Sequence, residues 1–180
     1  RVAKLLKQLK VKKGDRIAGY MANTIETVES FLATSAIGGI WSSTSPDFGV
    51  NAVIERFAQI KPKILFVTDR YYYNGKEINI VERLPAILKK IKSIKNIIIV
   101  NYPGQKYLKF EKINKINIYS WKEIIKIKTK KKEFEKFDFE HNLAILYSSG
   151  TTGKPKCICH RAGGVLLQHL KEHQLHCDIK

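Results

Sequence analysis

The sequence predicts an α/β fold in which a parallel sheet is flanked by helices. Short apolar runs alternate with amphipathic helical segments along the first hundred residues. Two of these runs, at 64–67 and 97–100, are apolar throughout, as strands are when both faces of a parallel sheet are buried. Strand–helix–strand order favours parallel pairing through right-handed crossovers. At 180 residues, the chain is long enough for one domain with a hydrophobic core.

The first elements of this sheet follow from local signals. Residues 1–10 form an amphipathic helix, residues 16–21 a strand, and another strand begins at 40–41. The helix between these strands is expected to start at Asn23, which forms a capping box with Glu26, and to stop at the glycine pair 38–39. Its buried face is expected to hold apolar side chains at helical spacing, which are Ile25, Val28, Leu32 and Ala36.

Two further helices are expected before the last strand of this half. One has Asp47 as its N-cap and ends before Pro62. Its apolar stripe consists of Val50, Val53, Ile54, Phe57 and Ile60. The other lies within 81–91, where Pro85 delays or kinks it. Its stripe consists of Val81, Leu84, Ile87, Leu88 and Ile91. The three tyrosines at 71–73 are interpreted as packing or interface residues.

After residue 101 the alternation weakens. Residues 102–140 are interpreted as a lysine-rich connecting segment, with a short docked helix at 121–125 and a solvated surface segment at 126–132. Residues 141–180 contain an apolar strand at 143–146, a loop, a returning strand at 157–160 and a helix at 163–176. The predicted organisation is therefore an α/β subdomain at 1–101, a connecting segment at 102–140 and a C-terminal part at 141–180.

Composition limits the possible partners. The formal net charge is +17, from 33 basic and 16 acidic residues, which invites a nucleic-acid or membrane interpretation. The excess is almost all lysine, is spread along the chain and accompanies abundant isoleucine, which favours solvated faces over a binding patch. We expect no nucleic-acid partner. No apolar run reaches the roughly 18 residues of a membrane span. The three cysteines cannot all pair in disulfides, which favours a reducing compartment, the cytosol. Without an initiator Met, the chain is expected to be an internal segment of a longer protein.

The loop at 147–156 reads Tyr-Ser-Ser-Gly-Thr-Thr-Gly-Lys-Pro-Lys and has the composition of a phosphate-binding loop. Glycines let backbone N–H groups approach an anion, hydroxyls donate hydrogen bonds and lysines supply positive charge. Its spacing differs from that of the nucleotide triphosphatase P-loop. A flexible linker is the alternative, but an apolar strand and Lys-Pro-Lys bracket this segment tightly. The candidate phosphate ligands are Ser148, Ser149, Gly150, Thr151, Thr152, Gly153, Lys154 and Lys156.

A second candidate site follows the strand at residue 40. Open α/β sheets bind ligands at the carboxyl ends of their strands, where the chain places Trp41, Ser42, Ser43 and Thr44. The alternative is an ordinary strand–helix turn with a tryptophan in the core.

Cysteines and histidines near the C-terminus raise the question of a metal site. In a strand, Cys157 and Cys159 share one face and His160 lies on the other, so one ion cannot easily bind all three. The final helix adds a ligand-like spacing but no HExxH carboxylate. Its candidate ligands are His169, His173, His176 and Cys177. We expect no zinc site.

The string Ser-Gly-Thr-Thr-Gly-x-Pro-Lys at 149–156 resembles the phosphate-binding signature of the adenylate-forming superfamily. This superfamily includes acyl-CoA synthetases, luciferases and peptide-synthetase adenylation domains. The segments 39–50, 73–77 and 163–173 are similar to the acetoacetyl-CoA synthetases, one family within it. The resemblance covers the chain from about residue 14 to 177 and is weakest at 102–136.

This resemblance implies part of the large N-terminal domain of an AMP-forming acid–thiol ligase. Such an enzyme uses ATP with Mg²⁺ to activate acetoacetate as an acyl-adenylate and transfers it to coenzyme A. The loop hydroxyls would contact the β- and γ-phosphates, and Lys156 would neutralise the leaving pyrophosphate. His160 lies near the nucleotide or acyl pocket by this resemblance, or is a hydrogen-bonded core histidine.

The catalytic lysine and the ribose-binding carboxylate of the superfamily are expected beyond Lys180, so the isolated chain is expected to be inactive. The alternatives are an acyl-CoA synthetase for acetate or another short-chain acid, and a non-enzymatic basic interaction domain.

Overall fold

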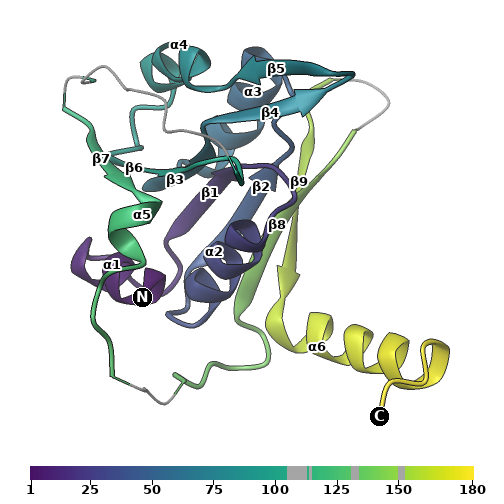
Figure 1. Cartoon of the computed structure of the whole chain (residues 1–180). Helices are drawn as coiled ribbons and strands as arrows, with labels where there is room; N and C mark the ends of the chain where they lie inside the picture. Colours follow the sequence, from purple (N-terminus) through teal and green to yellow (C-terminus); the bar gives the residue numbers. More distant parts are fainter. Residues whose placement is uncertain (105–112, 114, 131–133, 150–152) are drawn as a thin grey trace.

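The computed structural model describes residues 1–104, 113, 115–130, 134–149 and 153–180. Its main feature is a seven-stranded sheet in the order β7-β6-β3-β1-β2-β8-β9 (Figure 1). All neighbours pair in parallel except β8 and β9, which are antiparallel. The predicted α/β fold is confirmed.

The strands come from the whole length of the chain. In chain order they are β1 Arg16–Tyr20, β2 Ile40–Thr44, β3 Ile64–Thr68, β6 Asn96–Val100, β7 Asn117–Ser120, β8 Asn142–Ser148 and β9 Lys156–Arg161. A separate antiparallel pair consists of β4 Arg70–Tyr73 and β5 Lys76–Asn79. The large sheet therefore contains strands from each of the three segments distinguished in the sequence.

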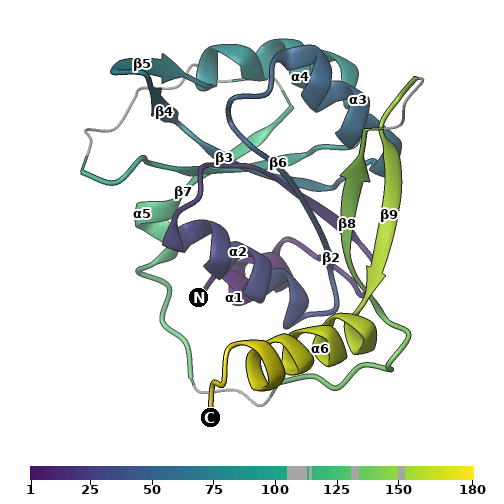
Figure 2. The ribbon, with the colours of Figure 1, turned by 90° about the vertical axis from the view of Figure 1, so that its right-hand side faces the viewer.

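Helices cover both faces of the sheet (Figure 2). Helices α3 (Val50–Ile60) and α4 (Leu84–Lys90) lie on one face, over a core that includes Phe57, Leu65 and Ile87. Helices α1 (Val2–Gln8), α2 (Ile25–Ser35) and α5 (Trp121–Ile124) lie on the other. Helix α6 (Ala162–Lys171) follows β9 and continues into a π-helical turn at Glu172–His176. Among the helices of the described segments, none has the length and apolar character needed to cross a bilayer.

The predicted buried face of α2 is wrong. Ile25, Val28 and Leu32 are 75%, 53% and 57% exposed, whereas Ser30 and Thr34 are fully buried. The two buried hydroxyls donate to carbonyls one turn earlier, at 2.7 and 2.8 Å, so their burial leaves no unpaired polar group. Small side chains on this face let the helix approach the sheet closely.

The predicted N-caps of α2 and α3, Asn23 and Asp47, are also wrong. Thr24 is the N-cap of α2 and Gly49 that of α3, and neither makes a side-chain cap hydrogen bond. The capping box instead lies at α5, where the Ser120 backbone N–H donates to the Glu123 carboxylate at 3.3 Å. That short helix was predicted correctly, although Ile125 beyond its end is 43% exposed. Helix α3 ends as predicted before Pro62, and α4 starts at Leu84 with Pro85 in its first turn.

The β4–β5 hairpin was not predicted. Its turn is Asn74-Gly75, and both residues have positive φ, 48° and 71°. Asn-Gly is the preferred pair for a two-residue hairpin turn of this kind, so the signal was present in the sequence. Two of the three tyrosines at 71–73 are exposed along this hairpin.

Candidate functional site

The predicted phosphate loop joins β8 to β9 at the carboxyl edge of the parallel strands. The antiparallel register pairs Ser148, the last residue of β8, with Lys156, the first of β9. Ser149, Gly153, Lys154 and Lys156 are exposed, and Ser148 is half-buried. The backbone of Gly153 has φ 111°, a conformation that favours glycine. The other predicted ligands, Gly150, Thr151 and Thr152, lie outside the described residues.

The second predicted site lies at the same edge of the sheet. Strand β2 runs parallel to β8, with Trp41 paired to Ala144, so both strands end on the same side as the loop. Ligands of open α/β sheets bind at such carboxyl edges. The fold therefore brings together two polar segments that are about 100 residues apart in sequence.

The side chains of β2 alternate between the two faces of the sheet. Trp41 is buried against Phe31 and Phe66, with ring centroids 6.4 and 5.9 Å away. A side chain at Gly19 on β1 would overlap this indole, because its Cβ would lie 2.6 Å from a Trp41 ring carbon. The tryptophan is therefore part of the packed core.

Ser42 points to the opposite face. It is fully buried and donates to the carbonyl of Ile145 at 2.8 Å, and its Oγ lies 3.1 Å from the hydroxyl of Tyr147. Burial raises the pKa of Tyr147 to about 12, and the Ser42 contact lowers it by a smaller amount. This pair holds β2 against β8 one residue before Ser148.

Thr44 and Ser43 complete the predicted group. Thr44 is 5% exposed, and its buried hydroxyl has no hydrogen-bond partner among the described residues. Ser43 is half-buried. An unpaired buried hydroxyl at a strand's carboxyl end is compatible with a ligand contact.

Trp41 and His160 line one cavity of about 510 Å³ on the α2 side of the sheet. The rest of the lining is mostly apolar and comes from α2, β8 and α6, as Phe31, Leu143, Ala144, Leu146, Gly164, Val165, Gln168 and His169. Cys157, in contrast, contacts Gln59 of α3, with Cys157 Sγ 3.6 Å from Gln59 Oε1. His160 and Cys157 thus face opposite sides of β9, as the strand geometry predicted. In the described ranges, no three His, Cys, Asp or Glu side chains group as metal ligands.

Arg83, which the sequence analysis did not single out, holds the segment after β2. Its guanidinium Nη1 donates to the carbonyls of Pro46 and Phe48, at 3.1 and 3.0 Å, and lies 2.6 Å from the hydroxyl of Tyr20. No local pattern marks this role, because the partners lie more than 30 residues away in sequence.

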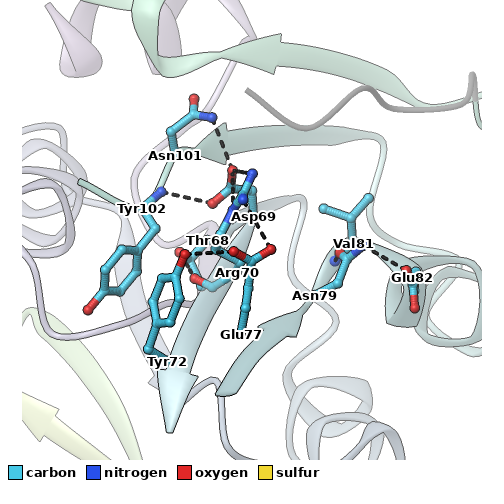
Figure 3. A network of polar contacts seen from close by, with 10 residues as sticks. All are labelled: Thr68, Asp69, Arg70, Tyr72, Glu77, Asn79, Val81, Glu82, Asn101 and Tyr102. Atoms are coloured by element: carbon cyan, nitrogen blue, oxygen red, sulfur yellow. Dashed lines mark hydrogen bonds and ion pairs between the residues drawn. The ribbon is translucent and has the colours of Figure 1, made fainter. Parts of the chain in front are cut away.

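A buried carboxylate organises the adjacent strand ends of β3 and β6 (Figure 3). Asp69 is fully buried and accepts hydrogen bonds from the Tyr102 backbone N–H at 2.8 Å and the Asn101 side chain at 3.1 Å. It also accepts from Arg70, which in turn donates to Glu77 of β5 at 3.1 Å. The hairpin is thereby tied to the end of the sheet.

Comparisons with known proteins agree with this geometry. The family model described as AMP-binding enzyme matches residues 1–178. An acetoacetyl-CoA synthetase from Gallus gallus is 45% identical over 98% of this chain, and one from Rhizobium meliloti (strain 1021) is 42% identical over all of it. The solved acetoacetyl-CoA synthetase from Streptomyces lividans superposes with a TM-score of 0.88 at 36% identity, over 99% of this chain.

These relatives are much longer. The chain spans 27% of each of the two sequences and 26% of the solved structure. The family match, however, extends over almost every residue present, including the phosphate loop. The chain therefore belongs to the AMP-binding enzyme family.

Proposed function

We propose that this chain is the phosphate-binding part of an ATP-dependent ligase that activates acetoacetate and transfers it to coenzyme A. The observation that carries the proposal is the glycine-, hydroxyl- and lysine-rich loop between β8 and β9, at the carboxyl edge of a parallel sheet. The similarity to acetoacetyl-CoA synthetases across the chain supports the choice of substrate.

The proposed reaction has two steps. The acetoacetate carboxylate attacks the α-phosphorus of ATP, forming acetoacetyl-AMP and releasing pyrophosphate, and the thiol of coenzyme A then displaces AMP. The loop's role is to hold the β- and γ-phosphates in line and to stabilise the charge that develops on pyrophosphate. Ser148, Ser149 and the loop backbone donate hydrogen bonds, and Lys154 and Lys156 supply positive charge.

Mg²⁺ is expected to bind together with ATP. When bound, it spreads the charge of the leaving pyrophosphate. The hydroxyl oxygens of Ser148 and Ser149 are ligands of the hard type that this ion accepts. We propose that the ion enters the site with the triphosphate, because Mg²⁺ is usually held by substrate phosphates together with few protein ligands.

Trp41 and His160 are proposed to lie close to the bound substrates, because both line the cavity between α2 and α6. Ser42, Ser43 and Thr44 remain proposed ligand-proximal residues at the end of β2. We also propose that the chain forms part of an N-terminal AMP-binding domain, with the boundaries at 101 and 140 predicted from sequence. Three free, exposed thiols favour a cytosolic location.

Two other functions are less well supported. A ligase for acetate or another short-chain acid would share the loop, but the similarity at 39–50 and 163–173 favours acetoacetate. A non-enzymatic basic interaction domain would account for the net charge of +17 but not for a phosphate loop at a sheet edge. Nucleic-acid binding that weakens steeply with salt would support that alternative.

Substrate competition in the full-length protein tests the proposal. A site that hydrogen-bonds the ketone oxygen leaves a donor unpaired when butyrate binds, so acetoacetate should have a kcat/KM about 10- to 100-fold higher. The measurement is acid-dependent ATP–pyrophosphate exchange with acetoacetate, butyrate and acetate. If acetate or butyrate is preferred, the proposed substrate is wrong, and if no acid supports exchange, the proposed ligase is wrong.

A further inference from the structure

Helix α3 contacts the β8–β9 hairpin directly behind the phosphate loop. The side-chain amide of Gln59 donates through Nε2 to the carbonyl of Pro155 at 2.9 Å. The same nitrogen donates to the carbonyl of Glu55, one turn earlier in α3, at 2.8 Å. One side chain therefore joins the helix to the residue that precedes Lys156.

The surroundings of the amide determine which way it points. Both groups facing Nε2 are carbonyl oxygens, so the flipped amide would place its own oxygen against two acceptors. On the other side, the Cys157 thiol donates to Oε1, with a sulfur–oxygen distance of 3.6 Å. Desolvation raises the pKa of this thiol above its ordinary value, so near neutral pH the thiol is protonated and able to donate.

The contact with Pro155 bears on Lys156 through the peptide bond. The peptide unit is planar, so a fixed Pro155 carbonyl also fixes the orientation of the Lys156 N–H and Cα. Pro155 is buried, and Lys156 pairs with Ser148 across the hairpin. The amide of Gln59 thus constrains the base of the lysine side chain while leaving its ammonium group free to reach phosphate.

Arg56, one turn earlier on the same helix, makes the second contact. Its guanidinium lies 4.5 Å from the ring centroid of Phe48 and 5.8 Å from that of Tyr147, the residue before Ser148. Arg56 Nη1 also donates to the Ala52 carbonyl at 2.9 Å, which holds the guanidinium on its own helix. Both strands of the hairpin are therefore supported by α3.

We propose that Gln59 is a positioning residue that orients Lys156 toward the phosphates of ATP. The inference rests on the proposed function, since it names a residue that fixes the position of Lys156 in the same phosphate loop. Gln59 does not touch the substrate. It acts by restricting the conformations of the hairpin end from which the lysine extends.

The test is a double-mutant cycle between Gln59 and Lys156 in the full-length protein. Gln59→Glu keeps the size of the side chain and removes its N–H donor. Asn51→Asp adds the same charge to an exposed position of α3 and serves as the matched control. The readout is kcat for acetoacetate-dependent ATP–pyrophosphate exchange, with the Tm of each variant to monitor folding.

Gln59→Glu is expected to lower kcat about tenfold, and Asn51→Asp less than about twofold. In a Lys156→Ala background, Gln59→Glu should change kcat less than about twofold, because the lysine it orients is gone. A merely structural role would instead lower kcat by the same factor in both backgrounds. That additive outcome, or wild-type kcat in Gln59→Glu, would overturn the inference.

Hydrogen exchange of the 153–158 backbone provides a readout besides activity. Exchange should be faster in Gln59→Glu than in Asn51→Asp. Equal exchange rates in the two variants would contradict the inference that Gln59 restrains this segment. An active wild type with an unaffected Gln59→Glu overturns the inference alone, whereas an inactive wild type overturns the proposed function together with it.

Discussion

Lys156 is exposed at the first position of β9, where its loss should change catalysis more than folding. In the full-length protein, Lys156→Ala should lower the rate of ATP–pyrophosphate exchange about 10- to 100-fold, since it removes one charge-assisted contact to the leaving group. Lys92→Ala, at an exposed position after α4, is the control and should keep its rate. A rate within about twofold of wild type would mean that the phosphate site is misplaced.

Tyr147 should make the stability of the chain sensitive to alkaline pH. Its pKa is raised by burial from 10.0 to about 12, so the folded state favours the protonated hydroxyl. This contribution is fully present below pH 10 and is lost as the pH rises through about 12. Tyr147→Phe should therefore reduce the decline in the free energy of unfolding between these pH values. Urea titrations of both proteins at several pH values measure this free energy. The same decline with pH in both proteins would contradict the prediction.

The sequence predicted which residues form a candidate site more readily than it predicted which residues contact one another. The loop composition at 147–156 predicted a phosphate site without any structural information. Gln59, Arg83 and Asp69 carry no comparable signal. The contacts that give them their roles, to Pro155, Phe48 and Tyr102, join residues more than 30 positions apart along the chain. Only the paired geometry distinguishes them from ordinary polar residues.

At the scale of elements, Asp69 is expected to hold the β4–β5 hairpin on the sheet. Asp69→Ala removes a buried acceptor from the Tyr102 backbone N–H, the Asn101 amide and the Arg70 guanidinium (Figure 3). Breaking a buried charged network of this kind costs about 3 kcal/mol in the free energy of unfolding.

Asp138→Ala is the matched control. Its carboxylate is 88% exposed and lies 3.7 Å from Lys13, so the change should be below about 0.5 kcal/mol. Equal losses in the two variants, measured by urea unfolding, would show that the Asp69 network does not stabilise the fold.

The hydrophobic periodicity predicted where most helices and strands lie, but it predicted the wrong buried face for α2. The apolar runs at β3 and β6 are buried as expected. Of the predicted stripe of α3, Val53, Phe57 and Ile60 are buried, and Val50 and Ile54 are half-buried. Helix α2 has the same kind of apolar stripe, yet it packs through Ser30 and Thr34. The difference is that small hydroxyl residues can bond to their own helix and pack closely, an option that an apolar stripe alone does not reveal.

At the scale of the whole molecule, most of the predicted phosphate ligands that the structure describes are exposed to solvent. Ser149, Lys154 and Lys156 are exposed, and the chain spans 27% of the length of its relatives. In-line attack on a phosphate needs a position fixed on both sides and a site from which water is excluded. The isolated 180-residue chain should therefore show no acetoacetate-dependent ATP–pyrophosphate exchange. Exchange above the rate of a buffer blank would contradict this prediction, and a thermal unfolding transition confirms that the tested sample is folded.

The sequence by itself determined the α/β class, most helices and strands, and the composition of the loop from which a phosphate site is predicted. These follow from the hydrophobic periodicity, from turn- and helix-breaking residues such as glycine and proline, and from side-chain composition. All three signals act within about ten neighbouring residues. The order of the strands in the sheet does not follow from such local signals, because β1 lies between β3 and β2, and β8 pairs with β2, about a hundred residues earlier.

Only the tertiary structure placed Ser42 against Tyr147 and Gln59 behind Lys156. Such contacts depend on which strands become neighbours, and that choice is made by the joint burial of all the apolar faces, not by any local pattern.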